Sequence, residues 1–383
     1  MRLLERGCAW KGGGMSAAFL AQDWCVPARG VWSRGMEYTV PQFTKTQVDK
    51  AGAVLTNPKA WTMAWDIDGA LEIINNHRAS HNFPLLVFRV DLTRRAHKVD
   101  LSATIAQRIK RLRSIEAKLS RFPTMRLAHM QDIGGCRAVV RNVRMVRELA
   151  NVYKKCRTKH RLLRFDDYLK EPRESGYRGI HLIYAYQSST KPVYNGLKIE
   201  IQLRSRQQHA WATAVETVDV FTGQALKGGR GTHEWQRFFA LMGTHIAAKE
   251  RCPAVPDTPS DPINLRDQIE EYVSDLDVFN HLWSYQATLQ TKDVPGADYY
   301  LLELNAERQE TTIVGYKKNE LKQAQDHYLA LEKSIAGQRD KDAVLVSVSS
   351  LESLKRAYPN YFADTHVFIQ TVTDAIREPQ SER

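Results

Sequence analysis

The sequence predicts a mixed α/β fold in which a sheet is flanked by helices, followed by a smaller α/β module at the C-terminal end. Two observations favour this class. Residues 198–204 alternate apolar and polar side chains, which is typical of a strand with one buried face. Several longer segments carry apolar residues at helical spacing. Residues 252–262 contain four prolines in eleven positions, so this segment is expected to be a linker without a helix.

The other elements are expected in order along the chain. Thr44 or Thr46 can cap a first helix over 47–55, and 60–76 has the spacing of a second helix. Residues 81–84 break the pattern, and 85–90 fit either a short strand or a helix. The sequence then predicts a basic helix over 101–122, a turn entering a strand over 130–141, helices over 143–153, 207–220 and 265–288, strands over 299–304 and 311–316, a helix over 319–337, a strand over 343–348, a helix that Ser350 caps and that ends at 357, and a last helix over 364–376.

The composition is that of a globular protein. Apolar residues make up 43% of the 383, and no run of eighteen or more apolar residues predicts a membrane-spanning helix. The five cysteines are scattered and odd in number, which favours a reducing cytoplasm over a disulfide framework. Residues 1–40 have no clean apolar core of a cleaved signal, and we expect them to form a poorly ordered arm.

The net charge of +12 is unevenly distributed. Residues 254–383 carry 13 Lys+Arg and 22 Asp+Glu, a net charge of −9, whereas the remainder carries +21. A basic body suggests a polyanionic ligand, and an acidic tail could dock on the same surface. The alternative is two ordinary domains of opposite charge, because charged segments are often solvated faces.

The central part of the chain, 167–209, holds the most distinctive residues. The segment 174–181 offers a tyrosine, an arginine and a histidine beside flexible glycines, and one turn separates it from 198–204, so the two are expected to be neighbouring strands. Along 198–204 the polar residues Glu200, Gln202 and Arg204 share one strand face. A carboxylate beside an arginine on an inward face is costly unless it is paired or does chemistry.

These motifs resemble the synthetase domain of the RelA/SpoT family, which moves pyrophosphate from ATP to a ribose 3′-hydroxyl. The resemblance rests on ESGYRGIH at 174–181, KIEIQLR at 198–204 and DIGGCR at 132–137. The layout is most similar to the toxic small alarmone synthetases of the CapRel type, in which toxin and antitoxin are fused and a phage capsid protein is sensed. It implies a synthetase (toxin) domain over 41–250, a linker and connecting helix over 251–295, and a pseudo zinc finger antitoxin or sensor module over 296–383.

The resemblance also implies an ATP site. Arg108 would stack on adenine, with Arg141 or Arg144 as a candidate for its other face, and Arg137 would face the phosphates. Lys110, Ser114 and Lys118 would hold the triphosphate, which needs several cations. Taken alone, this basic segment would be interpreted as a solvated helix face.

Asp132 and Glu200 are the implied catalytic pair and the implied ligands of Mg²⁺, since one or two carboxylates plus substrate phosphates are its usual partners. Glu200 would take or orient the proton of the attacking hydroxyl. Tyr177 would stack on the acceptor base, an interaction that does not distinguish guanine from adenine. His181, Arg204 and His209 would complete the acceptor site.

The most basic stretch of the chain predicts an RNA contact. A single nucleotide does not need so many cations, and an exposed sheet edge with this charge could bind tRNA phosphates. The alternative is a solvated edge that discourages aggregation. The residues concerned are Lys154, Lys155, Arg157, Lys159, Arg161 and Arg164.

Tyr358 and Tyr361 resemble the neutralising motif of the C-terminal module, in which an aromatic ring takes the place of adenine. The alternative is a pair of tyrosines packed on the core at a helix end. Cys252 is the only cysteine after Cys156, so no cysteine-based zinc site can form in this module.

Three functions remain open from the sequence. The first is a toxin that transfers pyrophosphate from ATP to the 3′-hydroxyl of the tRNA acceptor end, held inactive by contact with its own C-terminal module. The second is an alarmone synthetase that uses GDP or GTP. The third is a non-catalytic domain that binds RNA or a partner. The intact Asp132, Glu200, Tyr177 and Lys118 argue against the third, and the basic stretch favours the first. No His-Asp metal motif indicates a hydrolase.

Overall fold

The computed structural model describes residues 38–57, 67–222, 226, 231–284, 288–292, 295–335, 338, 341–348, 351–362 and 365–377. Most of the expected N-terminal arm, residues 60–66 of the expected second helix and the expected cap Ser350 lie outside these ranges.

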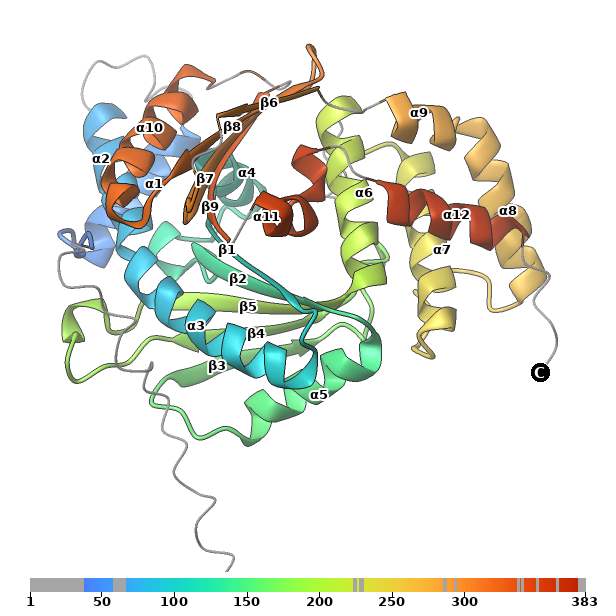
Figure 1. The fold of residues 1–383 in the computed structure, drawn as a ribbon, viewed down its shortest axis with the longest axis horizontal. Coiled ribbons are helices and arrows are strands. Elements are labelled where there is room, and N and C mark those ends of the chain that lie inside the picture. The colour runs from blue at the N-terminus through green and yellow to red at the C-terminus, as the bar shows by residue number, and fades with distance from the viewer. Residues whose placement is uncertain are drawn as a thin grey trace, which may run out of the picture.

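The described strands form one mixed sheet of nine strands flanked by helices, as the sequence predicts (Figure 1). The order across the sheet is β3-β4-β5-β2-β1-β9-β7-β8-β6. The β2–β5 and β6–β8 pairs are parallel and the others antiparallel. The strand bounds are β1 Thr104–Ile109, β2 Gly134–Val140, β3 Arg161–Asp167, β4 Ile180–Ala185, β5 Lys198–Ser205, β6 Thr288–Lys292, β7 Tyr299–Asn305, β8 Glu310–Tyr316 and β9 Lys341–Ser347.

Most helices follow the predicted order with shifted ends, but the helix over His233–Lys249 has no predicted counterpart. Thr44 caps the first helix through a capping box with Gln47. The helix bounds are α1 Lys45–Thr56, α2 Ile67–Ser80, α3 Asn82–Val99, α4 Leu112–Arg121, α5 Val143–Lys155, α6 Arg206–Thr222, α7 His233–Lys249, α8 Pro262–Asp275, α9 Val278–Ser284, α10 Leu321–Ser334, α11 Leu351–Ala357 and α12 His366–Arg377.

Four expectations for secondary structure need correction or resolution. Residues 174–179, expected to be in a strand beside β5, form a loop in which Gly176 has a φ of 89°, and the neighbouring strand β4 begins only at Ile180. The predicted helix over 101–122 is a strand, β1, followed by α4, because β1 pairs with β2 on one side and β9 on the other. Residues 85–90 belong to a helix, α3. The predicted helix over 265–288 ends at Asp275, and a new helix follows Asp277, whose φ of 46° lies in the left-handed region and interrupts the helix.

The two faces of the central strands differ in chemistry. On one face, alternate residues of β2, β4 and β5 form a core with α3 and α5, and Ile199, Ile201 and Leu203 are completely buried in it. The opposite face meets α6 and α11 and carries polar residues. The predicted alternation along β5 is therefore confirmed, and it points Glu200, Gln202 and Arg204 away from the core.

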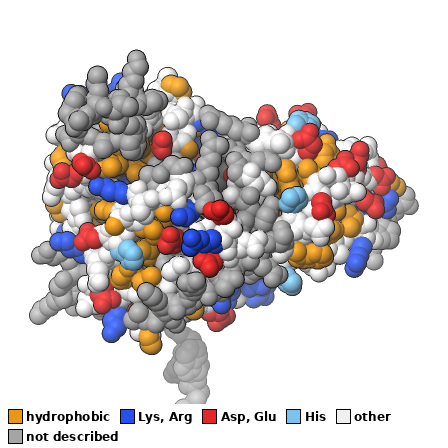
Figure 2. All heavy atoms as spheres, turned by 90° about the horizontal axis from the view of Figure 1, so that it is seen from above, with side chains coloured by type: hydrophobic (Ala, Val, Ile, Leu, Met, Phe, Trp, Pro, Cys, Tyr) orange, Lys and Arg blue, Asp and Glu red, His pale blue; other side chains and the backbone are white. Residues whose placement is uncertain are grey.

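The C-terminal strands continue the same sheet across the predicted linker. Strand β9 pairs with β1, placing Ser347 opposite Gln107 and Val346 opposite Arg108. The last helix, α12, packs against α6, α7 and α8 at the far end of the molecule (Figure 1). Acidic side chains gather over that end, where α8 and α9 lie (Figure 2). Within the described residues, no helix combines the length and the apolar character needed to cross a membrane.

Candidate active site

Strand register gathers polar residues on the face of the sheet that meets α6 and α11. Gly135 of β2 lies opposite Arg108 of β1 and opposite Glu200 of β5. Arg137 lies opposite Gln202, and so does His181 of β4. Residues that are paired across neighbouring strands point to the same face, so four strands supply one cluster. A Cβ on Gly135 would come within 3.9 Å of Glu200 Oε2, so this glycine leaves the carboxylate open space.

Asp132, at the entry to β2, is held by two lysines. Lys110 Nζ donates to Asp132 Oδ2 at 2.8 Å, and Lys118 Nζ donates to Asp132 Oδ1 at 2.9 Å. Burial alone would raise the pKa of Asp132, but the two ammonium groups outweigh it and hold the pKa well below its ordinary value. Ser114 lies one turn before Lys118 on α4. Two of the predicted ATP residues, Lys110 and Lys118, thus contact the predicted metal ligand.

Glu200 and four other side chains form a closed ring of hydrogen bonds. Gln202 Nε2 donates to Glu200 Oε2 at 2.7 Å, and His181 Nδ1 lies 2.9 Å from Glu200 Oε1. Arg204 Nη2 donates to Gln202 Oε1 at 2.9 Å and to Tyr177 Oη at 3.0 Å. Tyr177 Oη lies 2.5 Å from His181 Nε2, which completes the ring. Three of the four predicted acceptor residues, Tyr177, His181 and Arg204, are therefore joined to the predicted base, whereas His209 is not part of the ring.

The ring favours a charged histidine. Burial would lower the pKa of His181, but Tyr177 and Glu200 outweigh burial and raise it to about 9. Burial would raise the pKa of Glu200, and the imidazolium holds it below its ordinary value instead. The pKa of Tyr177 is also lowered despite burial, because Arg204 and His181 both face its oxygen. Near neutral pH the site holds an imidazolium paired with a carboxylate.

A second cationic cluster lies beside the ring. Burial and the nearby Arg204 lower the pKa of Arg137 to about 10. Burial, Arg137 and Arg204 hold the pKa of His209 well below its ordinary value, so this imidazole is neutral. Arg137 Nε, Arg204 Nε and Nη1, and His209 Nδ1 are buried and have no hydrogen-bond partner among the described residues. The three arginine N–H groups are buried donors without partners, which suits an anionic ligand. His209 Nδ1 is an acceptor, because Nε2 carries the proton of the neutral ring and faces the Arg356 carbonyl.

The end of α11 covers this second cluster. The ring of Tyr358 lies 5.3 Å from the Arg137 guanidinium, and Arg137 Nη2 donates to the carbonyl of Ala357. His209 Nε2 lies 3.2 Å from the carbonyl oxygen of Arg356. Tyr358 Oη donates to the carbonyl of Gln107 at 3.0 Å. Burial raises the pKa of Tyr358, and the charges of Arg137 and Arg108 oppose that rise.

Tyr361 lies deeper than Tyr358. Its side chain is completely buried, receives a hydrogen bond from Arg111 Nη1 at 2.9 Å and donates to Asp342 Oδ2 at 3.0 Å. Arg111 also forms an ion pair with Asp342. Both predicted tyrosines are thus packed in one buried cluster, which also contains Ala106 of β1, as the core-packing alternative expects. Their hydroxyl groups differ, because Tyr358 bonds to the carbonyl of Gln107 and Tyr361 bonds to Arg111 and Asp342.

Other predicted residues lie away from this cluster. Arg144 is exposed in the first turn of α5, beyond the end of β2 that is remote from Asp132. The predicted RNA residues are exposed on the last turn of α5, the following loop and the edge strand β3. Among them, Lys154 Nζ lies over the Phe165 ring at 4.2 Å, and Arg164 pairs with Asp166 at 2.7 Å.

Sequence reasoning missed a buried ion pair between α2 and α10. Arg78 Nη1 donates to Glu332 Oε2 at 2.7 Å, and Glu332 Oε1 accepts from Tyr328 Oη at 2.7 Å and from the backbone N–H of Leu112 at 2.9 Å. The carboxylate therefore also caps the start of α4. A signal existed, because Glu332 lies at helical spacing from Leu321, Ala324 and Tyr328 on the buried stripe of α10.

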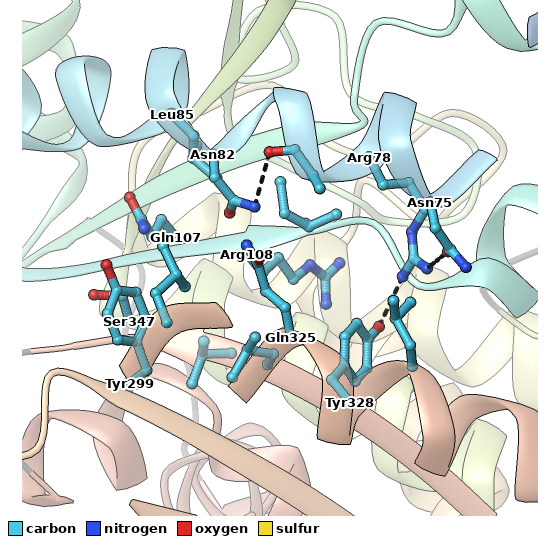
Figure 3. Close-up of a pocket in the computed structure, with 16 residues that line it drawn as sticks. Asn75, Arg78, Asn82, Leu85, Gln107, Arg108, Tyr299, Gln325, Tyr328 and Ser347 are labelled. Carbon is cyan, nitrogen blue, oxygen red and sulfur yellow. Dashed lines mark hydrogen bonds between the residues drawn. The ribbon is translucent and has the colours of Figure 1, made fainter. Parts of the chain in front are cut away.

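A small cavity lies at the same seam (Figure 3). Its volume is about 50 Å³, and Arg78, Gln107, Arg108, Gln325 and Tyr328 are among the residues that line it. Neither Asp132 nor Glu200 lines this cavity, so it is separate from the predicted catalytic pair. Among the described residues, no group of three or more His, Cys, Asp or Glu side chains could hold a metal ion.

Comparison with known proteins places similarity on the same part of the chain. Residues 107–218 match the family model described as "Region found in RelA / SpoT proteins". The GTP pyrophosphokinases YjbM and YwaC of Bacillus subtilis (strain 168) are 32% identical over 114 residues and 30% identical over 111 residues; each match covers 28% of this chain and 52% of the relative. The chain thus spans about half the length of the curated relatives it matches.

Solved structures show a more distant likeness. Small alarmone synthetase 1 from Bacillus subtilis bound to its product pppGpp has a TM-score of 0.39 at 20% identity, covering 49% of this chain and 94% of that chain. A GTP pyrophosphokinase family protein from Streptococcus pneumoniae has a TM-score of 0.36 at 22% identity, covering 52% of this chain and 92% of that chain.

Proposed function

We propose that this chain is a pyrophosphokinase that moves the β,γ-pyrophosphate of ATP to the 3′-hydroxyl at the tRNA acceptor end and so blocks translation. One observation carries the proposal: a single sheet face brings Asp132, Glu200 and Tyr177 together with several cations. The match to a RelA/SpoT region over 107–218 supports the reaction class, since it spans these residues. In this proposal residues 41–250 are the toxin domain, 251–295 the connection and 296–383 a pseudo zinc finger antitoxin module.

The donor set fits Mg²⁺. Asp132 and Glu200 come from adjoining strands, and Asp132 is near enough to influence the pKa of Glu200. Two carboxylates would leave most coordination positions of the ion to phosphate and water oxygens, which is the usual arrangement for Mg²⁺. When bound, the ion would neutralise charge on the triphosphate. Lys110 and Lys118 now neutralise Asp132, and we propose that they move to the phosphates when ATP binds.

The proposed transfer needs positioning more than covalent chemistry. The 3′-oxygen of the acceptor bonds to the β-phosphorus of ATP, the bond from that phosphorus to the α,β-bridging oxygen breaks, and AMP leaves. Glu200 orients or accepts the hydroxyl proton. His181 holds Glu200 in place, and Tyr177 stacks on the terminal base, while Arg204 and His209 contact the acceptor.

The exposed cations at the end of α5 and on β3 support tRNA as the acceptor, because an extended polyanion can use charges outside the site. A second candidate acceptor is GDP or GTP, which would make the chain an alarmone synthetase. The names of the two curated relatives favour it. A compact nucleotide has no need of the cations on β3.

We further propose that the C-terminal module inhibits the enzyme. Tyr358 packs against Arg137 and near Arg108, the residue proposed to stack on adenine. An adenine ring and the tyrosine ring could not both lie against these arginines. Release by a phage capsid protein, as in anti-phage defence in the cytoplasm, follows from the resemblance to CapRel proteins.

The test uses full-length protein with γ-labelled ATP and either bulk tRNA or GDP plus GTP. We compare wild type with Tyr358→Ala and Tyr361→Ala. Removing either ring should raise label transfer by roughly tenfold to a hundredfold. The reason is that burial of the ring, worth about 1.5–3 kcal/mol, no longer stabilises the inhibited form in which the C-terminal module covers the arginines. The same variants should be toxic in cells.

Each outcome has a distinct meaning. Label on tRNA supports the toxin, and label only on guanosine nucleotides supports the alarmone synthetase and contradicts tRNA as acceptor. Tyr358→Phe is the matched control, since it keeps the ring and should stay inhibited. Equal activity in wild type and both alanine variants would contradict autoinhibition. Adding purified capsid protein to wild type tests the trigger, and no increase with any capsid protein of an infecting phage would contradict it.

A further inference from the structure

We infer that helices α7 and α12 position the loop that carries Tyr177, so the end of the chain supports the acceptor site while residues 356–361 cover the neighbouring arginines. The consequence for catalysis rests on the proposed function. The positioning itself rests on contacts between the loop over 174–179, α6, α7 and α12.

The loop and α7 meet backbone to backbone. A Cβ on Gly243 of α7 would lie 2.7 Å from Gly176 Cα and 2.9 Å from the Gly176 carbonyl oxygen. A Cβ on Gly176 would lie 2.6 Å from the Phe239 carbonyl oxygen, and Gly176 has a φ of +89°, which L side chains rarely adopt. Two glycines are therefore needed for the loop to lie this close to the helix.

A series of aromatic rings continues from Tyr177 to the last helix. The ring centroids are 6.3 Å apart for Tyr177 and Trp211, 5.8 Å for Trp211 and Phe239, and 5.8 Å for Phe239 and Phe368. Trp211 Nε1 also donates to the Phe239 carbonyl at 2.9 Å. The ring proposed to stack on the acceptor base thus packs, through two neighbours, on a residue of α12.

Helix α12 is anchored to the helices it supports. Phe368 is completely buried. Thr371 Oγ1 donates to Gln207 Oε1 of α6 at 2.9 Å, and Lys249 Nζ of α7 donates to Asp374 Oδ2 at 3.3 Å. The contacts tie α12 to the two helices nearest the loop, so its position affects theirs.

The position of the loop matters because Tyr177 Oη belongs to the polar ring. It lies 2.5 Å from His181 Nε2 and 3.0 Å from Arg204 Nη2. A hydrogen bond weakens steeply beyond normal distances, so a shift of about an ångström would open the ring. Gly243, Phe239 and Phe368 are positioning residues in this sense, since they act through Tyr177.

Gly243→Ala in the full-length Tyr358→Ala background is the first test. Alanine favours a helix over glycine by about 1 kcal/mol, so α7 should not lose stability. The added methyl should displace residues 174–179. Hydrogen exchange of the amides in 174–179 should rise at least tenfold while that of β2 stays the same, and KM for the acceptor should rise at least tenfold with KM for ATP changed less than twofold.

Phe368→Leu and Phe368→Ala form a graded second pair, with Val367→Ala as the control because Val367 is the exposed neighbour on α12. Exchange over 174–179 should increase from leucine to alanine and remain unchanged in the control. If Phe368→Ala does not fold, Phe368→Leu and Gly243→Ala still test whether α12 and α7 position the loop over 174–179.

Unchanged exchange of 174–179 in a folded Gly243→Ala protein would overturn the inference, and so would equal rises of KM for ATP and acceptor. If no acceptor is labelled by any variant, the proposed function fails, but the exchange result still decides whether α7 and α12 position the loop.

Discussion

The two faces of strand β5 carry opposite kinds of residue and teach different lessons. On one face Ile199, Ile201 and Leu203 are completely buried and contribute through removal of apolar surface from water. On the other face Glu200 and Arg204 are placed where polar groups are costly. Glu200 is paired with Gln202 and His181, whereas Arg204 uses Nη2 in the ring and keeps two buried N–H groups without a partner among the described residues. One face therefore specifies the fold, and the other is organised for a charged partner.

A pair of variants on adjacent positions gives the largest expected effect. Glu200→Gln should reduce label transfer by about 10²–10⁴-fold with a small loss of stability, because a general base is removed while volume is kept. Ile201→Ala should lower the free energy of unfolding by about 2–5 kcal/mol through a cavity in the core. Single-turnover transfer and urea unfolding check the two effects. Wild-type transfer by Glu200→Gln would remove Glu200 from the site.

A smaller effect is expected on the pH dependence of the free energy of unfolding, which should fall as the pH rises. The pKa of His181 is raised from 6.5 to about 9, so its contribution is complete below pH 6.5 and is lost as the pH rises toward 9. The loss should be on the order of 2–3 kcal/mol and absent in His181→Gln. Urea unfolding at pH 6.5 and pH 9 measures it. An equal alkaline decline in both proteins would show that His181 is not the cause.

The smallest effect on transfer is expected away from both faces of β5, at the C-terminal end of α5. Lys154→Glu with Lys155→Glu should raise KM for tRNA several-fold and reduce its salt dependence, because phosphate contacts are lost, while KM for ATP stays the same. Lys322→Glu on α10 is the matched control, since Lys322 is exposed and lies on a different surface. Equal loss for tRNA and ATP would mean that the surface is misassigned.

The sequence predicted those structural features that depend on residues close together in the chain. The alternation along β5, the cap at Thr44 and the hairpin of β7 and β8 follow from neighbours in sequence. Strand β1 was predicted as a helix because its apolar residues continue the spacing of α4, and its pairing with β2 on one side and with the distant β9 on the other is not visible in that local pattern.

In the candidate site, too, the residues could be predicted from the sequence but their contacts could not. Residues named from motifs meet on one face, but their hydrogen bonds depend on register between strands, which the sequence leaves open. Glu332 was missed because a buried carboxylate has meaning only with its partner Arg78 on a distant helix. Tyr358 and Tyr361 were predicted as a pair and lie in one buried cluster, yet the partners of their hydroxyl groups, Gln107 for one and Arg111 and Asp342 for the other, could not be predicted from the motif.

The joint between β1 and β9 has a consequence for the lifetime of a released enzyme. Among the described residues of β1, only Gln107 and Arg108 pair with β9, so few backbone hydrogen bonds hold the two halves of the sheet together. If the C-terminal strands leave, β1 becomes a sheet edge with unpaired backbone donors and acceptors, which are a template for pairing with other chains. Activation by such a movement would therefore also make the protein prone to self-association, and the active form would be short-lived.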